Sequence, residues 1–204
     1  MGHWNTKEGI MELLYRLVKV PSVTGTRGEL RMEDEISAIL KEMPYFQKYP
    51  DQIYRKEITG DLLNRKAVAA FYQGSKTSKK TIILLSHYDV VGVEDYGRLA
   101  PLAFSPLECT SAMAEENLSV DAEQDLKSGE WIFGRGIMDM KAGLAIQMAL
   151  LSEASEQGNL KHNLLFLATP DEERYSAGMF AGVELIKGIK DQYQLDLEVA
   201  ICSE

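Results

Sequence analysis

The sequence predicts an α/β domain built on a largely parallel sheet, and three observations favour this class. Short apolar runs bounded by turn residues, which are typical of strands, begin near Lys66. Apolar residues recur at helical spacing in the chain before those runs. A longer segment that is apolar almost all round separates the second run from the third, and it is typical of a helix buried against a sheet. Strands joined through a buried helix are usually parallel.

Two amphipathic helices are expected ahead of the strands. Asn5 and Glu8 have the spacing of a capping box, and apolar side chains follow at helical intervals over residues 10–18. The segment VPSVTG ends this helix, and Thr26 with Glu29 then repeats the capping pattern ahead of a second apolar series. Each helix therefore presents one apolar face to a core.

Four strands and one buried helix account for the rest of the predicted core. The strands read AVAAFYQG, TIILLSHYD, NLLFLATP and LEVAICSE, over residues 67–74, 81–89, 163–170 and 197–204. The buried helix, KAGLAIQMALLSEASEQG, covers residues 141–158. Residues 92–130 are acidic and polar without a sustained apolar period, and we expect a long surface excursion there. Excursions of that length in a compact domain are usually functional or disordered.

Composition and charge exclude several classes of partner. With 45% hydrophobic residues among 204, the chain has enough apolar material for a core of its own. Its 22 basic and 31 acidic residues give a net charge of -9, which disfavours nucleic acid and anionic membrane surfaces as partners. The two cysteines, Cys109 and Cys202, are far apart, and neither a signal peptide nor a membrane span is evident. We therefore expect a protein of the reducing cytoplasm.

Acidic residues follow three of the predicted strands at the point where each strand ends. If these strands are parallel, their carboxyl ends share one edge of the sheet, where open α/β folds bind ligands. The side chains expected to converge there are His87, Asp89, Asp171, Glu172, Glu173 and Glu204. Asp139, just before the buried helix, is expected at the same edge. Clustered carboxylates repel one another unless a cation offsets their charge, so a divalent metal site with oxygen and imidazole ligands is predicted.

Each motif also has a plainer interpretation when it is taken alone. His87 and Asp89 alternate onto the same face of a strand and could form a simple hydrogen-bonded pair. The acidic run DEE could be a solvated turn, and GRG could cradle a phosphate, although it lacks a full phosphate-loop pattern. His3, His162 and Cys202 lack neighbouring carboxylates or a base, so each is interpreted as structural, Cys202 as a small buried residue. The ordered occurrence of acidic strand ends favours the metal site.

Four motifs in order, SHYDVV, GRGIMDMKAG, TPDEERYSAG and AICSE, resemble those of the dizinc metallopeptidase family of aminoacylases, glutamate carboxypeptidases and succinyl-diaminopimelate desuccinylases. The resemblance runs from LVKVPSVTG to Glu204 and is strongest to the bacterial arginine-utilisation branch. It implies a three-layer catalytic domain of the zinc-exopeptidase type. It also implies hydrolysis of an amide bond in a small amino-acid derivative or peptide, within arginine degradation. The alternative is a non-catalytic binding or scaffold domain that keeps this fold.

The resemblance implies which residues hold the two zinc ions. His87, Asp139 and Glu204 would ligate the first zinc ion. Asp139 would bridge to a second zinc ion, which Glu173 would also ligate.

Two further acids are implied to act in the reaction without ligating metal. Asp89 would orient the ring of His87. Glu172 would be the general base that takes a proton from water and passes it to the leaving amine. The resemblance further implies a cis peptide bond between Asp139 and Met140.

Relative to the family pattern, residues 1–204 are expected to be the N-terminal part of a catalytic domain. Family members continue into a lid and dimerisation domain and then return to the catalytic domain with a last histidine ligand, so an oligomer is expected only of a longer protein. Without that histidine, the second site would keep only Asp139 and Glu173. At most one zinc ion and no useful hydrolysis are therefore expected here. The pKa of Glu173 should rise through repulsion by Glu172 and Asp139.

Overall fold

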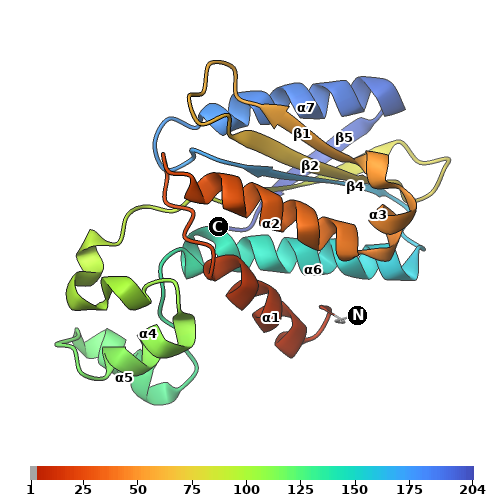
Figure 1. The fold of residues 1–204 in the computed structure, drawn as a ribbon. Helices are drawn as coiled ribbons and strands as arrows, with labels where there is room; N and C mark the ends of the chain where they lie inside the picture. The colour runs from red at the N-terminus through yellow and green to blue at the C-terminus, as the bar shows by residue number, and fades with distance from the viewer. Residues whose placement is uncertain (1–3) are drawn as a thin grey trace.

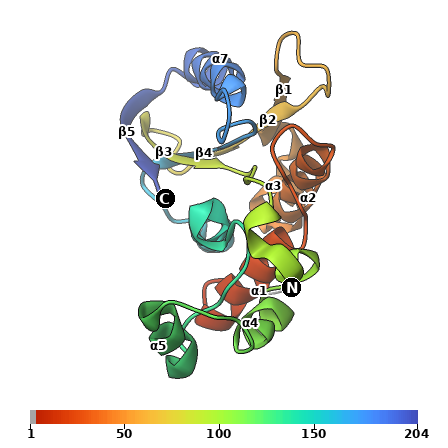
Figure 2. The same ribbon diagram turned by 90° about the vertical axis from the view of Figure 1, so that its left-hand side faces the viewer.

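The protein is described by a computed structural model over residues 4–204, in which helices cover both faces of a five-stranded sheet (Figure 1). Helix α7 lies on one face, and helices α1, α2 and α6 lie on the other (Figure 2). Their bounds are Lys7–Val18 for α1, Gly28–Glu42 for α2, Ala142–Gln157 for α6 and Ala177–Tyr193 for α7. The predicted three-layer α/β architecture is confirmed.

The sheet is mixed, with the strand order β1-β2-β4-β3-β5. Strands β1 to β5 span Ile53–Glu57, Lys66–Tyr72, Lys80–His87, Asn163–Thr169 and Asp196–Cys202. Strand β3 is parallel to both β4 and β5, whereas β2 is antiparallel to both β1 and β4. Only β2 therefore runs against the others, and the carboxyl ends of β3, β4 and β5 meet at one edge, as the sequence predicted.

Strand β4 is buried along its whole length because both faces of the sheet are covered. Leu164 and Phe166 pack into the core shared with α1, α2 and α6. Leu165 and Leu167 alternate onto the other face and pack into the core beneath α7. This double burial explains why the segment NLLFLAT is almost continuously apolar.

Strand β5 is exposed along most of its length. It lies at the edge of the sheet and pairs, within residues 4–204, with β3 alone. Val199 and Ile201 are 49% and 44% exposed, and Cys202 is also exposed. The expectation that Cys202 is a small buried residue was wrong, because apolar character in this strand does not reflect burial.

The structure corrects both predicted helix caps. The hydroxyl of Thr6, not the side chain of Asn5, caps α1 by accepting an amide hydrogen bond at 3.1 Å. Arg27 occupies the cap position of α2 and makes no capping hydrogen bond through its side chain. Glu29 does not form a box with Thr26, because its carboxylate is fully buried against other partners.

Residues 92–130 form helices, and the polar sequence there is not a sign of disorder. They are the 3-10 helical segment η2 at Glu94–Leu102, helix α4 at Pro106–Met113 and helix α5 at Val120–Ser128. Figures 1 and 2 show α4 and α5 away from the sheet. Few apolar side chains of this segment are buried, Leu99 and Cys109 among them, which explains the absence of an apolar period.

Three short helical segments complete the fold. They are α3 at Pro44–Lys48, η1 at Pro50–Gln52 and η3 at Ile137–Lys141. Across residues 4–204, none of the helices has both the length and the apolar character that a bilayer-spanning segment requires.

Candidate metal centre

Three separate segments bring one imidazole and two carboxylates together at the carboxyl edge of the sheet. His87 ends β3, Glu204 follows β5 by two residues, and Asp139 lies in η3, directly before α6. One ligand atom from each lies within 4.8 Å of the other two. His87 Nε2 is 2.8 Å from Asp139 Oδ1. The approach of His87 to Glu204 follows from the parallel pairing of β3 with β5.

The backbone of the turn that carries Asp139 passes close to the side chain of Val90. It follows Gly136, whose φ is +72° and where an added Cβ would lie 2.3 Å from Val90 Cγ1. The peptide bond between Asp139 and Met140 is cis, as the resemblance implied. The Met140 sulfur accepts the backbone N–H of His87 at 3.1 Å, which connects the turn to β3. The side chain of Asp139 remains 54% exposed and can reach a ligand.

Gln147 in α6 ties the ends of β3 and β5 together. Its side-chain amide donates to the Leu85 carbonyl at 3.0 Å, the Ile201 carbonyl at 3.3 Å and Ser203 Oγ at 2.9 Å. Its Oε1 accepts the hydroxyl of Ser86 at 2.7 Å. The sequence reasoning missed this residue, although a lone amide within the apolar run GLAIQMALL was an available signal.

The buried carboxylate of Asp89 joins the histidine to the acidic loop after β4. Its Oδ1 accepts the N–H of Glu172 at 3.0 Å, and its Oδ2 accepts the N–H of Glu173 at 3.1 Å and the hydroxyl of Thr24 at 2.7 Å. Oδ1 also lies 3.5 Å from His87 Nδ1, whose nearer partner is the Asp89 backbone carbonyl at 3.1 Å. Burial opposes ionisation, but hydrogen bonds from His87, Thr24 and the Glu172 amide hold the pKa of Asp89 below its usual value.

The donor set fits a metal cation such as zinc. With Nδ1 of His87 against the Asp89 carbonyl, Nε2 faces Asp139 and Glu204. One imidazole nitrogen and two carboxylate oxygens are ligands that zinc binds readily. Burial disfavours the imidazolium, but Asp89 and Asp139 outweigh it and raise the pKa of His87 to about 9. The surroundings of His87 therefore favour positive charge.

Glu172 and Glu173 lie beside this cluster without belonging to it. Glu172 is exposed, whereas Glu173 is half-buried. Burial is the largest cause that raises the pKa of Glu173, and Asp139 adds to it, while His87 opposes the rise. The expected direction is confirmed, although repulsion by Glu172 is a minor cause.

Asp171 does not converge on the cluster, and that expectation was wrong. Its backbone has a φ of +67°, and its buried carboxylate bonds to Arg65 at 2.8 Å. A guanidinium therefore offsets its charge at a separate place in the fold. Of the other histidines, His162 lies on the surface before β4, and His3 is outside the described residues.

The GRG motif precedes the irregular segment η3 and does not lie at the start of a regular helix. Arg135 instead forms an ion pair with Asp95 and lies 5.0 Å over the Tyr96 ring. The motif thus connects the segment 92–130 to the turn before α6.

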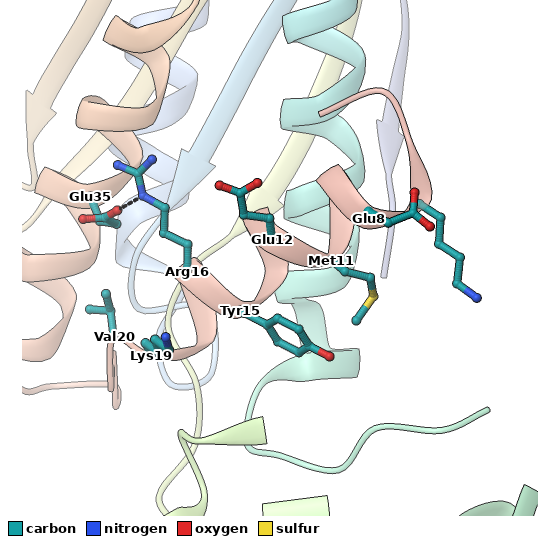
Figure 3. A pocket seen from close by; sticks show the side chains of 9 residues that line it. Glu8, Met11, Glu12, Tyr15, Arg16, Lys19, Val20 and Glu35 are labelled. Carbon is teal, nitrogen blue, oxygen red and sulfur yellow. Dashed lines mark hydrogen bonds and ion pairs between the residues drawn. The ribbon is translucent and has the colours of Figure 1, made fainter. Parts of the chain in front are cut away.

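A surface groove of about 790 Å³ lies along α1 (Figure 3), and its lining does not include His87, Asp139 or Glu204. Met11 and Tyr15 line it, and Arg16 bridges to Glu35 across it. Among residues 4–204, no histidine or cysteine lines this groove, so the clustered residues define the candidate site.

A model of peptidase family M20/M25/M40 matches residues 83–204, which is more than half of the chain. The match includes β3, the turn with Asp139, the acidic loop after β4 and β5. The chain belongs to peptidase family M20/M25/M40. The uncharacterized protein YqjN of Bacillus subtilis (strain 168) is similar to this M20 chain, with 39% identity over 204 residues. Protein RocB of the same organism is 37% identical over 202 residues.

These M20 relatives are longer than the chain. The alignments cover 99% and 98% of the chain but 36% of YqjN and 36% of RocB. The solved structure of the di-peptidase Dug1p from Saccharomyces cerevisiae superimposes with a TM-score of 0.68 and 18% identity, over 100% of this chain and 42% of that one. At such low identity the superposition shows the fold alone.

Proposed function

We propose that this M20 chain supplies the metal-binding part of a zinc-dependent peptidase or amidohydrolase. The observation that carries the proposal is the convergence of His87, Asp139 and Glu204 within 4.8 Å at the carboxyl edge of the sheet. Such a site is suited to hydrolysis of an amide bond in a small amino-acid derivative or peptide. The motif resemblance supports arginine degradation as its setting, and the two distant cysteines fit a reducing cytoplasm.

In this proposal each polar residue of the site has one task. A zinc ion held by His87, Asp139 and Glu204 would supply a Lewis acid that polarises the scissile carbonyl and acidifies water. Glu172 accepts a proton from the attacking water and delivers it to the leaving amine, as the C–O bond forms and the C–N bond breaks. Asp89 holds the ring of His87 and, through two amide hydrogen bonds, the loop that carries Glu172.

The proposal extends to a second zinc ion and to the organisation of longer members. Asp139 would bridge to this ion and Glu173 would ligate it. Residues 1–204 would form the first part of the catalytic domain, and a lid or dimerisation domain would belong to the remaining length of such proteins. These 204 residues would then bind at most one zinc ion well, because two carboxylates without an imidazole make a weak zinc site.

Calorimetric zinc titration tests the proposed ligands. The wild type should bind one tight equivalent, and His87→Ala should lose it. His162→Ala is the matched control, because His162 is exposed and outside the cluster, and it should bind as the wild type does. Equal binding by His87→Ala would contradict the assignment.

Hydrolysis of N-acyl amino acids and dipeptides separates an enzyme from a binding domain. In a protein of the relatives' length that carries these residues, Glu172→Gln should abolish turnover and leave tight zinc binding intact. Zinc binding without turnover in the parent protein would instead support a non-catalytic binding or scaffold domain.

A further inference from the structure

A buried arginine and three carboxylates form a second charged cluster, apart from the candidate metal ligands. Arg65 lies directly before β2, and its side chain is 9% exposed. Its guanidinium bonds to Asp61 at 2.7 Å, Glu29 at 3.0 Å and Asp171 at 2.8 Å. These partners come from the turn between β1 and β2, from α2 and from the loop after β4. The Arg65 cluster thus joins three segments that are far apart in the sequence.

The Arg65 cluster holds the backbone of the acidic loop at its first residue. Glu29 Oε1 accepts the N–H of Asp171 at 3.0 Å, and the Asp171 carboxylate accepts the N–H of Ala177 at 3.2 Å. The Asp171 carbonyl accepts the N–H of Ser176 at 2.6 Å, which closes the loop on itself. The φ of +67° at Asp171 is uncommon for a non-glycine residue and is kept by these surrounding bonds.

We propose that Arg65 is a positioning residue for Glu172 and Glu173, which follow Asp171 directly. This inference rests on the proposed function, in which both acids serve the metal centre. The guanidinium fixes Asp171, while the Asp89 carboxylate holds the amides of the next two residues. The acidic loop is therefore held at Asp171 by Arg65 and at the next two residues by Asp89. Through Asp171, Arg65 fixes where Glu172 and Glu173 lie relative to His87.

Arginine is suited to this task in a way that lysine is not. The planar guanidinium donates in several directions at once, whereas an ammonium group is a single point of charge. Loss of the guanidinium would leave buried carboxylates without a counterion. Burial already raises the pKa of Glu29 to about 7 against the opposing effect of Arg65, so the cluster has little tolerance for losing its cation.

Amide hydrogen exchange on the 204-residue chain tests the positioning role without any need for turnover. Arg65→Met should speed exchange of the amides at 171–176 by about tenfold or more relative to those of α6, since hydrogen bonds to charged groups are lost. In Arg65→Lys the exchange rate of these amides should be intermediate, because lysine keeps the positive charge without the planar guanidinium. Arg55→Lys is the matched control, because Arg55 also pairs with α2 through Asp34 but does not contact the loop, and it should leave these amides unchanged.

Amide NMR shifts and turnover separate positioning from simple stabilisation. The resonances of Glu172 and Glu173 should move in Arg65→Lys and stay in place in Arg55→Lys. In a protein of the relatives' length, Arg65→Lys should lower kcat on the order of 10- to 100-fold with little change in KM. Asp171→Asn, which keeps the side-chain volume, replaces Arg65→Met if that variant does not fold.

Two outcomes would overturn the inference. Unchanged exchange and shifts at 171–176 in folded Arg65→Met or Asp171→Asn would show that the cluster does not hold the loop. Equal acceleration in α6 would show a general loss of stability and no local positioning. The proposed function could fail separately. If Arg65→Met loosens the loop but the parent protein neither binds zinc nor turns over substrate, the Arg65 cluster does hold the loop and the proposed function is refuted.

Discussion

At the residue scale, the absence of a side chain at Gly143 allows a close approach that the candidate site depends on. Gly143 lies in the first turn of α6, where a Cβ would fall 2.0 Å from the Ser203 carbonyl oxygen. The residue next to Ser203 is Glu204, so this close approach brings the Glu204 carboxylate to the other two candidate ligands. Gln147, one turn further along α6, bonds to Ser203 Oγ and secures the same segment.

Gly143→Ala should weaken zinc binding on the order of tenfold, the range seen when support around metal ligands is removed. The added methyl group must push residues 203 and 204 away from α6. Gly188→Ala in α7 is the matched control, because a Cβ added at this exposed position would have no atom within 4 Å. That control should bind zinc normally and gain roughly 0.5–1 kcal/mol of stability. Unchanged zinc affinity in Gly143→Ala, measured by chelator competition, would refute this account of Glu204.

At the scale of elements, β4 is the centre of the fold, and it carries no candidate ligand within its own length. Its side chains alternate between the two cores, and its end delivers the acidic loop to the site. Because β4 pairs with both β2 and β3, a change in its packing should lower the stability of the whole sheet.

Phe166→Ala should destabilise the chain by about 3–5 kcal/mol, the usual cost of truncating a buried phenylalanine. The loss is large beside a typical total stability of about 5–15 kcal/mol. Urea unfolding followed by circular dichroism measures it. Leu62→Ala is the control, since Leu62 is 97% exposed, and its effect should stay within about 0.5 kcal/mol. Similar losses in both variants would show that β4 is not central to the core.

At the scale of the whole molecule, the excess negative charge is concentrated on one part of the chain. Residues 92–130 contain nine acidic and two basic residues, while the net charge of all 204 is -9. Residues 92–130 as a whole, helices and connecting loops together, therefore carry most of that excess. A molecule with this charge attracts cations, including a divalent metal, more than anions.

Zinc should raise the Tm of the chain, because a ligand that binds only the folded state stabilises it. At a free zinc concentration 100-fold above Kd the gain is about 2.7 kcal/mol, and each kcal/mol shifts Tm by about 2–4 °C. Differential scanning fluorimetry measures the shift, and a chelator should reverse it. Magnesium is the control, since it prefers an all-oxygen octahedral shell and should have little effect. Equal shifts with both metals would indicate general charge screening and no imidazole site.

Several tertiary features were beyond the reach of sequence reasoning. Strand β1 was missed because IYRKE is short and polar, and α7 was missed because its exposed face carries apolar residues such as Phe180 and Val183. Arg65 was missed because its partners are separated by many residues along the chain. Asp171 was misplaced, since local pattern does not reveal that a left-handed residue turns its carboxylate toward Arg65.

The sequence by itself determined the layered α/β class, the shared edge of β3, β4 and β5, and the family. These follow from hydrophobic periodicity and from motif order, which depend on residues close together in the chain. Only the tertiary structure decided that His87, Asp139 and Glu204 come within 4.8 Å, whereas Asp171 joins Arg65 and Cys202 stays exposed. The physical reason is that burial and charge pairing depend on neighbours brought together by folding, and a linear pattern does not record which neighbours those are.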